Sequence, residues 1–274
     1  MNKSIILAKQ EFLGGLRNKW LIIYSLSYIL LALALSPFSL AGLNILGMKA
    51  VGKVLSSLIN LSLYLIPLIS LAISSISIVG DRETNFMEWL FSKPINEYQY
   101  ILGKFLGLTA SISISTLLGF GIASWMVLLF LPPEDISKYF ILLSIAILLS
   151  IVFIPMGLLI SLKSRTRYQA LGTAFFTWFF LVFIYDLFVM SFIVNYIENP
   201  LYASILGILN PVEATRLLMV RTIDPQLTFL GFTGVYILRE NINLLITVSI
   251  FVMVIYSILF LMLTYIQLSR EDLI

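Results

Sequence analysis

The 274-residue chain contains no cysteine and no histidine. Without cysteine there are no disulfide bonds and no thiolate metal ligands, and without either residue there are no Ser-His or Cys-His nucleophilic centres. Only 11% of the residues are charged, whereas a soluble globular domain has about a quarter. These absences exclude most classes of enzyme and do not fit a soluble globular domain.

Apolar residues are abundant: they make up 60% of the chain, and the mean hydropathy is +1.02. A bilayer's hydrocarbon core needs about 20 apolar residues of helix. Six segments meet this need, of which the first is interrupted by Ser36-Pro37. They are 20–40, 54–79, 105–131, 139–162, 168–194 and 243–268. We therefore predict an all-α, polytopic integral membrane protein in which residues 1–274 form a single domain with six transmembrane helices.

The positions of the basic residues predict the topology, because cytoplasmic loops retain Lys and Arg. With the N-terminus inside, 11 of the 17 basic residues lie on the cytoplasmic side, and the tightest cluster is KSRTR at 163–167. The eleven are Lys3, Lys9, Arg17, Lys19, Arg82, Lys93, Lys104, Lys163, Arg165, Arg167 and Arg270. We predict a multi-pass protein of the plasma membrane with both termini in the cytoplasm. These loops account for the net charge of +3, so we expect no nucleic-acid partner.

Residues 1–19 precede the first predicted span and have an amphipathic pattern. Their apolar residues fit one helical face, with most of the polar residues elsewhere. The apolar residues are Ile5, Ile6, Phe12, Leu13 and Leu16. The pattern allows two interpretations: a helix that binds membrane lipid on the inner surface, or an inward extension of the first span.

The outer segment 195–242 contains LYASILGILNPVEATRLLMV, which has nearly the length of a span. Asn210-Pro211 would break such a helix, and Glu213 and Arg216 would lie in the middle of the bilayer at a high cost. We predict short helices on the outer face that dip partly into the membrane.

Asp186 lies near the outer end of the fifth predicted span. An ionisable residue within a span is a candidate functional site. Its position near the end of the span also allows a purely structural role, in which the carboxylate reaches water.

Two stretches rich in small residues, 69–80 and 108–124, belong to the second and third predicted spans. Serine and glycine at regular intervals allow membrane helices to approach closely. We predict that these two spans pack against each other, and the alternative is that the small polar residues line a substrate path.

The stretch GDRETNFMEWLFSKP, residues 80–94, interrupts the apolar sequence between the second and third spans. It predicts a short cytoplasmic helix with Asp81 and Glu83 in its first turn, at the positive end of the helix dipole, and an end at Pro94. A helix of about three turns is marginally stable alone and must pack on something.

The two faces of this predicted helix differ. Phe86, Trp89 and Leu90 share one face, while the polar face is net acidic. The charged residues are Asp81, Arg82, Glu83, Glu88 and Lys93. A helix that rests on anionic lipid is usually rich in Lys and Arg, so the pattern favours a protein partner over the alternative of a helix in the lipid headgroups.

The sequence DRETNFMEWLFSKPINEYQYILGK resembles the first cytoplasmic loop of type-2 ATP-binding-cassette (ABC) exporter permeases. The matching residues are Asp81, Arg82, Glu83, Leu90, Pro94, Gly103 and Lys104. Asn85 and Phe86 depart from the usual Gly-Thr, and Glu97 stands where a basic residue is common.

A second motif, LNPVEATRLL, narrows the resemblance to one branch of that family. It resembles the Asn-Pro-acidic-Arg motif of the branch that contains the permease of the nitrous-oxide-reductase maturation transporter. The matching residues are Asn210, Pro211, Glu213 and Arg216.

The resemblance implies that the 80–104 loop carries a coupling helix, which enters a groove on a cytoplasmic ABC ATPase subunit and transmits its nucleotide-driven closure to the spans. The implied coupling residues are Asp81, Arg82, Glu83, Phe86, Glu88, Trp89, Leu90 and Pro94. Trp89 is the kind of aromatic residue that dominates protein interfaces. The resemblance also implies outward transport and a dimer of this chain with itself or with a homologous permease.

We expect no catalytic site, cofactor or metal in the chain itself, so that ATP and magnesium would be held by the ATPase. GMKAVGKV at 47–54 matches the spacing of a phosphate-binding loop but has Val54 where a Ser or Thr must reach magnesium. An intramembrane aspartyl protease would need a second aspartate in Gly-x-Gly-Asp, and VGDR at 79–82 lacks the first glycine. The alternative function is a non-transporting membrane scaffold or assembly factor that docks a cytosolic protein through residues 80–94.

Overall fold

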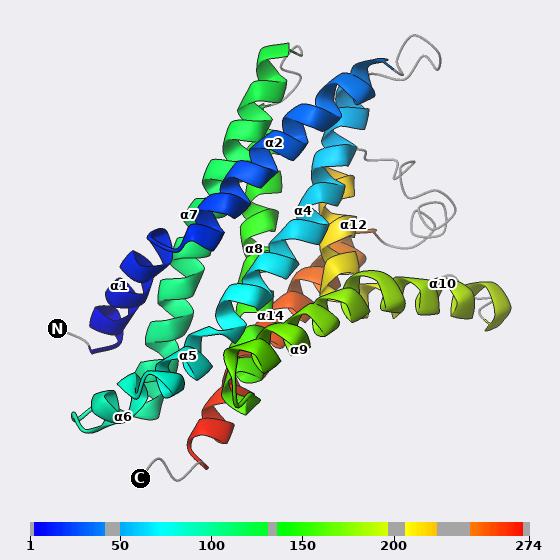
Figure 1. Ribbon diagram of the computed structural model, residues 1–274. Helices are drawn as coiled ribbons and strands as arrows, with labels where there is room; N and C mark the ends of the chain where they lie inside the picture. The colour runs from blue at the N-terminus through cyan, green and yellow to red at the C-terminus, as the bar shows by residue number, and fades with distance from the viewer. Residues whose placement is uncertain (1–2, 42–49, 131–135, 197–205, 224–241, 271–274) are drawn as a thin grey trace.

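A computed structural model describes residues 3–41, 50–130, 136–196, 206–223 and 242–270 (Figure 1). Within these ranges the chain folds into helices without any strand, which confirms the predicted all-α class. The first helices are α1 (Lys3–Leu16), α2 (Lys19–Ala41), α4 (Ala50–Ser75), α5 (Ser77–Glu83), α6 (Phe86–Phe91) and α7 (Glu97–Phe130). They are followed by α8 (Ile136–Lys163), α9 (Arg167–Phe179), the π-helix η1 (Phe180–Ile184), α10 (Tyr185–Tyr196), α12 (Pro211–Ile223) and α14 (Ile242–Leu268).

Five helical stretches of the described residues are long and apolar enough to cross a membrane. They are Ser56–Glu83, Glu97–Ala123, Ser137–Lys163, Arg167–Val189 and Asn243–Leu268. The predicted first span, 20–40, coincides with α2, a helix of 23 residues. The apolar part of α2 whose side chains are described, Lys19–Leu31, is shorter than a span, so the sixth crossing stays a prediction.

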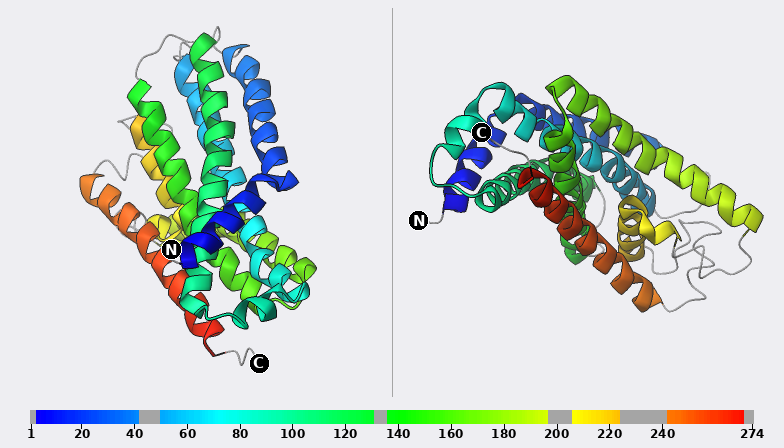
Figure 2. Two further views of the ribbon diagram at one scale, coloured as in Figure 1. Left: turned by 90° about the vertical axis from the view of Figure 1, so that its left-hand side faces the viewer. Right: turned by 90° about the horizontal axis from the view of Figure 1, so that it is seen from below.

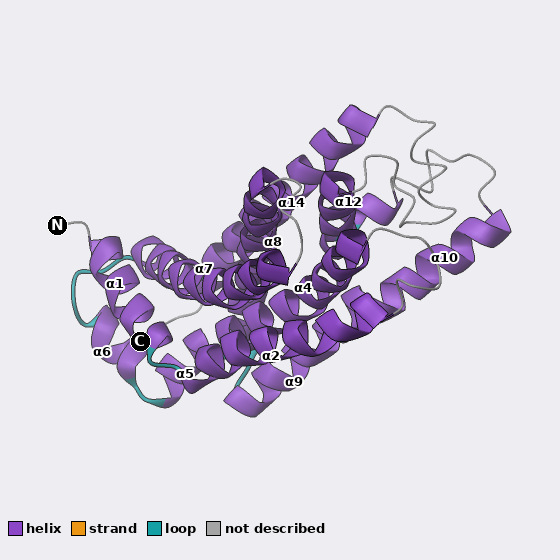
Figure 3. Ribbon diagram, turned by 90° about the horizontal axis from the view of Figure 1, so that it is seen from above, coloured by secondary structure: helices purple, strands orange, loops and turns teal. Residues whose placement is uncertain are grey.

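Helix α4 lies at the centre of the bundle, with α2, α8, α9 and α12 around it (Figure 3). Its small-residue stretch packs mainly on α8, where Gly157 leaves room for the side chain of Ser74. The small-residue stretch of α7 packs instead on α2, and Ser25 Oγ donates a hydrogen bond to the Ser115 carbonyl at 3.0 Å. The second and third predicted spans, α4 and α7, do contact each other as predicted, but α8 and α2 are their larger partners, because sequence spacing does not identify the main partner helix.

The N-terminal helix α1 is separate from α2 and crosses the start of α7 (Figure 2). The Asn18 side chain accepts a hydrogen bond from the Trp20 backbone N–H at 3.0 Å and so begins α2 as a new helix. Glycines allow the close crossing: a Cβ at Gly103 would lie 2.6 Å from the Cβ of Leu7. Of the two interpretations of residues 1–19, the separate helix is confirmed, and its contact with lipid stays a prediction. Its exposed apolar residues are Ile5, Ile6, Leu13 and Leu16.

Helices α9, η1 and α10 form one continuous helical segment that starts beside α5 and bends away from the bundle (Figure 1). The Trp178 indole N–H donates a hydrogen bond to the Tyr64 carbonyl of α4 at 2.9 Å. The Phe183 ring stacks on the Tyr64 ring with centroids 5.8 Å apart. These contacts fasten the bend of the segment to the central helix.

Helix α12 is a 13-residue helix packed among α4, α8 and α14. Pro211 occupies the first helical position, where its missing N–H costs nothing, and Asn210 Oδ1 accepts a hydrogen bond from the Val212 N–H at 3.0 Å. Thirteen residues are too few to cross a membrane, so 195–220 does not form a further span in the described part. The remainder of the predicted outer segment, 197–205 and 224–241, lies outside the described residues.

One end of the bundle gathers several predicted cytoplasmic elements. This end contains the helices α1, α5 and α6, the turn between α8 and α9, and the last turn of α14 (Figure 1). The same end therefore carries the 80–94 stretch and the KSRTR cluster.

Candidate docking and coupling site

The 80–94 stretch forms two short helices rather than one. Helix α5 continues from α4 after a turn at Ile76, and α6 begins after Thr84-Asn85. Asn85 has a φ of 56°, a left-handed conformation that asparagine tolerates better than most residues. The prediction of one helix that begins near Asp81 is wrong, and so is the dipole argument, because Asp81 and Glu83 lie in the last turn of α5.

Helix α6 has one buried side and one exposed side. Met87 and Leu90 are buried in the core, whereas Trp89 is 54% exposed. The predicted face shared by Phe86, Trp89 and Leu90 is thus divided, with Leu90 inside and Trp89 outside. The Phe86 and Trp89 rings lie 5.5 Å apart, and Lys93 Nζ lies 3.5 Å above the Trp89 ring. Trp89 is held at the surface by its neighbours.

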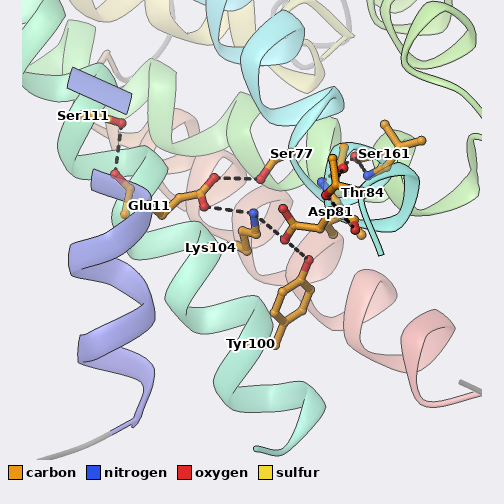
Figure 4. A network of polar contacts seen from close by, with 12 residues as sticks. Glu11, Ser77, Asp81, Thr84, Tyr100, Lys104, Ser111 and Ser161 are labelled. Carbon is orange, nitrogen blue, oxygen red and sulfur yellow. Dashed lines mark hydrogen bonds and ion pairs between the residues drawn. The ribbon is translucent and has the colours of Figure 1, made fainter. Parts of the chain in front are cut away.

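Asp81 points away from this surface and into a polar cluster (Figure 4). The Tyr100 hydroxyl donates a hydrogen bond to Asp81 Oδ2 at 2.8 Å, and Lys104 Nζ lies 2.8 Å from the same oxygen. Lys104 Nζ also lies 2.9 Å from Glu11 Oε2 of α1. The Ser77 hydroxyl donates to Glu11 Oε1 at 2.9 Å. The cluster joins α1, α5 and α7.

Helix α8 holds α5 on a second side. The backbone N–H groups of Ile78 and Val79 both donate to Ser161 Oγ at 2.9 Å. Arg82 Nη1 donates to the Leu162 carbonyl at 3.3 Å. The first N–H groups of a helix lack partners within it, and here the Ser161 hydroxyl accepts from two of them.

Glu83 connects α5 to α9 on a third side. Its Oε1 accepts a hydrogen bond from the Arg167 backbone N–H at 2.9 Å, and its Oε2 lies 3.0 Å from Arg167 Nε. Arg167 Nη2 donates to the Gly80 carbonyl at 3.1 Å. A Cβ at residue 80 would lie 3.1 Å from this guanidinium group, so glycine lets Arg167 lie close to the backbone of α5.

The surface around α6 is consequently less acidic than the sequence suggests. Asp81 pairs with Lys104, and Glu83, although exposed, pairs with Arg167. Glu88 is exposed as well. The net acidic face towards a partner stays a prediction. The exposed aromatic side chain of α6 is Trp89, which packs on the half-buried Phe86, with Pro94 exposed nearby.

Comparisons with known proteins identify the family. A family model described as "ABC-2 family transporter protein" matches residues 5–273. The "Probable ABC transporter permease protein NosY" of Pseudomonas aeruginosa is 30% identical over 225 residues, which cover 80% of this chain and 82% of that protein. The protein of the same name from Stutzerimonas stutzeri is 30% identical over 225 residues, 80% of this chain and 81% of that protein. The chain belongs to the ABC-2 transporter family. The resemblance drawn from the two motifs is thereby confirmed.

The second motif of this ABC-2 transporter forms a compact cluster between α10 and α12. Arg216 Nη1 lies 2.7 Å from Glu213 Oε1 and 3.4 Å from Asp186 Oδ2. Asn210 Nδ2 donates to the Leu181 carbonyl within η1 at 2.6 Å. Glu213 and Arg216 are three residues apart in α12, a spacing at which side chains on a helix can pair. The third member, Asp186, lies 30 residues earlier in the chain.

Glu213 and Arg216 are largely buried in this cluster, whereas the Asp186 side chain is 46% exposed. Burial raises the pKa of the Glu213 carboxyl to about 7, and the Arg216 guanidinium opposes this rise. Arg216 Nε is buried and has no hydrogen-bond partner within the described residues. Since α12 lies outside the candidate spans, the cluster marks the place where the short helix is fastened to the fifth predicted span.

Sequence reasoning missed several residues of the candidate coupling site in this ABC-2 transporter. Glu11, Tyr100, Ser161 and Arg167 contact α5 but were not predicted as site residues. One signal was available: Glu11 is the only acidic residue before Asp81 in the chain. A lone carboxylate in an otherwise basic and apolar N-terminal segment indicates an internal partner for it.

Across the described ranges, no group of three or more acidic side chains is arranged to hold a metal ion. Most of the phosphate-loop-like stretch 47–54 lies outside the described residues.

Proposed function

We propose that this chain is the membrane-spanning permease subunit of an ABC exporter, driven by a separate cytoplasmic ATPase subunit that docks on α5 and α6. The observation that carries the proposal is the exposed Trp89 of α6, supported from behind by Met87 and Leu90 in the core. Rigidly held aromatic side chains at a surface are typical centres of protein interfaces. The membership of the ABC-2 family and the naming of both relatives as permeases support this assignment.

The contacts of α5 support a role in force transmission. Within seven residues, α5 binds α7 through Asp81, α1 through Ser77, α8 through two backbone N–H groups, and α9 through Glu83. A displacement of α6 by a docked ATPase would therefore reach three apolar helices at once. A loop attached only at its two ends would absorb such a displacement instead.

The remaining parts of the proposal concern orientation and assembly. The end of the bundle that carries α5 and α6 faces the cytoplasm, since the KSRTR cluster at 163–167 lies there and cytoplasmic loops retain basic residues. Both termini then lie in the cytoplasm and the protein lies in the plasma membrane. The chain assembles with a second copy or a homologous permease, transport is outward, and the ATPase holds the ATP and magnesium.

Substitution of Trp89 tests the proposal. The chain is purified from its native membrane in mild detergent, and the ATPase subunit that accompanies it is identified. Trp89→Ala should release this ATPase, because truncating an aromatic interface centre typically costs about 2 kcal/mol or more, about a thirtyfold loss of affinity. Trp125→Ala is the matched control, since Trp125 is 66% exposed near the opposite end of α7. Full retention of the ATPase by Trp89→Ala would refute the docking site.

A further inference from the structure

At the end of the bundle that carries α5 and α6, the charged side chain of Lys104 is buried, with 6% of the residue exposed. Its ammonium group lies 2.9 Å from a carboxylate oxygen of Glu11 and 2.8 Å from one of Asp81. These two acidic residues are 70 positions apart in the chain and belong to α1 and α5. Figure 4 shows Lys104 between them.

Each carboxylate of this cluster has a second donor besides Lys104. The Tyr100 hydroxyl donates to Asp81, and the Ser77 hydroxyl donates to Glu11. Tyr100 and Lys104 are four residues apart and so share one face of α7. The two hydroxyl groups reduce the cost of burying two negative charges beside one positive charge. Lys104 contacts both carboxylates and so connects them.

Direct packing between α1 and α6 is incomplete at this place. A cavity of about 20 Å³, room for about one water molecule, is lined by Leu7, Gln10 and Glu11 of α1, Phe86 of α6, and Tyr100 and Lys104 of α7. The close contacts of α1 are with α7, around Gly103 and Gly107. The polar cluster thus ties the 80–94 stretch to the N-terminal helix, together with a second polar contact, the exposed hydrogen bond that Lys3 Nζ donates to the Pro94 carbonyl.

We propose that Lys104 is a positioning residue that holds α1, α5 and α7 together as one unit and thereby fixes the orientation in which Trp89 is presented to the ATPase. This inference rests on the proposed docking function but is not contained in it. Lys104 does not touch the ATPase. It acts through Asp81 and through Glu11.

The test must separate positioning from folding. Lys104→Met alone leaves two partly buried carboxylates without their cation, so this variant is expected to fold poorly. The informative variant is Glu11→Gln/Asp81→Asn/Lys104→Met, in which no buried charge remains. The amide oxygens at 11 and 81 still accept hydrogen bonds from Ser77 and Tyr100, so only the contacts of Lys104 are lost.

The first measurement needs no ATPase. Because the chain has no cysteine, Lys9→Cys on α1 and Ser92→Cys after α6 provide two labelling sites in an otherwise unmodified protein. Spin labels there report the distribution of distances between α1 and α6. The triple variant should fold as a monodisperse helical protein with a broadened distribution, whereas the control Lys19→Met, which removes an exposed lysine, should keep the wild-type width. A wild-type width in the folded triple variant would overturn the proposal.

The second measurement is the affinity of the triple variant for the co-purified ATPase. If the docking orientation falls to about a tenth of the population, the apparent Kd rises about tenfold. A broadened distribution with unchanged affinity, in a chain whose Trp89→Ala variant does lose the ATPase, would also overturn the positioning role. If Trp89→Ala keeps the ATPase, the docking site itself is wrong, and the distance measurement decides whether Lys104 ties α1 to α5.

Discussion

Glu83 makes two interactions with Arg167 at the start of α9, and their contributions to stability can be measured separately. Glu83 accepts a backbone hydrogen bond from the Arg167 N–H and pairs with the Arg167 side chain. The side chains of Arg167 and Glu83 are 47% and 36% exposed, so solvent screening limits the ion pair to about 0.5 kcal/mol. The backbone bond resembles a helix cap, which is worth about 1 kcal/mol. The backbone bond is therefore the larger contribution.

Three variants distinguish these contributions. Glu83→Ala loses both, about 1.5 kcal/mol in total. Glu83→Gln keeps an acceptor for the backbone N–H and loses about 0.5 kcal/mol. The exchange Glu83→Arg/Arg167→Glu restores opposite charges but offers no acceptor to the backbone N–H at 167, so it should recover only the smaller part.

Amide hydrogen exchange at the beginning of α9 is the assay. A loss of about 1.4 kcal/mol raises the population of the open first turn about tenfold, so Glu83→Ala should speed exchange there by about that factor. Glu88→Ala, which removes an exposed carboxylate of α6, is the matched control and should leave α9 unchanged. Complete recovery by the charge exchange would refute the reasoning, because it would mean that the ion pair carries the whole effect.

Three further predictions concern the other end of the bundle and the topology. Burial raises the pKa of Glu213 from 4.5 to about 7. Between these pH values the folded protein keeps a proton that the unfolded chain releases, so the stability contributed by this site falls as the pH rises towards 7. Glu213→Gln should abolish this pH dependence of the thermal denaturation temperature. The exchange Glu213→Arg/Arg216→Glu should fail to restore the stability that either single reversal loses, since it places a glutamate beside Asp186; full restoration would show that Asp186 does not take part. A cysteine at Ser137 should react with a membrane-impermeant reagent from outside the cell and one at Arg165 should not, and the opposite pattern would invert the topology.

The existence and extent of the long apolar helices could be predicted from the sequence, but their polar ends could not. The third predicted span begins at 105, whereas α7 begins at Glu97. Hydropathy excludes Glu97 and Lys104 from a span, yet in the fold Lys104 is neutralised by two carboxylates that come from other helices. A pattern along one segment cannot report charges supplied by distant segments.

The candidate site shows the same limit in another form. Asp81, Glu83 and Trp89 were identified as site residues, but the periodicity predicted one continuous helix. The break depends on a single backbone angle, the positive φ of Asn85, and an asparagine in mid-sequence is compatible with helix and with turn. Whether Asp81 and Glu83 face a partner or the protein's own core is decided by Lys104 and Arg167, which no spacing rule connects to them.

The π-helix η1 sets which side chains of α10 face α12. Their orientation therefore depends on the number of residues between α9 and α10, and not only on which residues these are. A π-helical turn accommodates one residue more than an α-helical turn, so every side chain after Ile184 is rotated by about 100° relative to an uninterrupted α-helix. Removing one residue between Phe180 and Ile184 would restore a regular helix and turn Asp186 away from Arg216. It would also disturb the Leu181 carbonyl that Asn210 binds. Relatives that are one residue shorter in this stretch are therefore expected to have lost the acidic residue at 186 and the asparagine at 210 together, as a single correlated change.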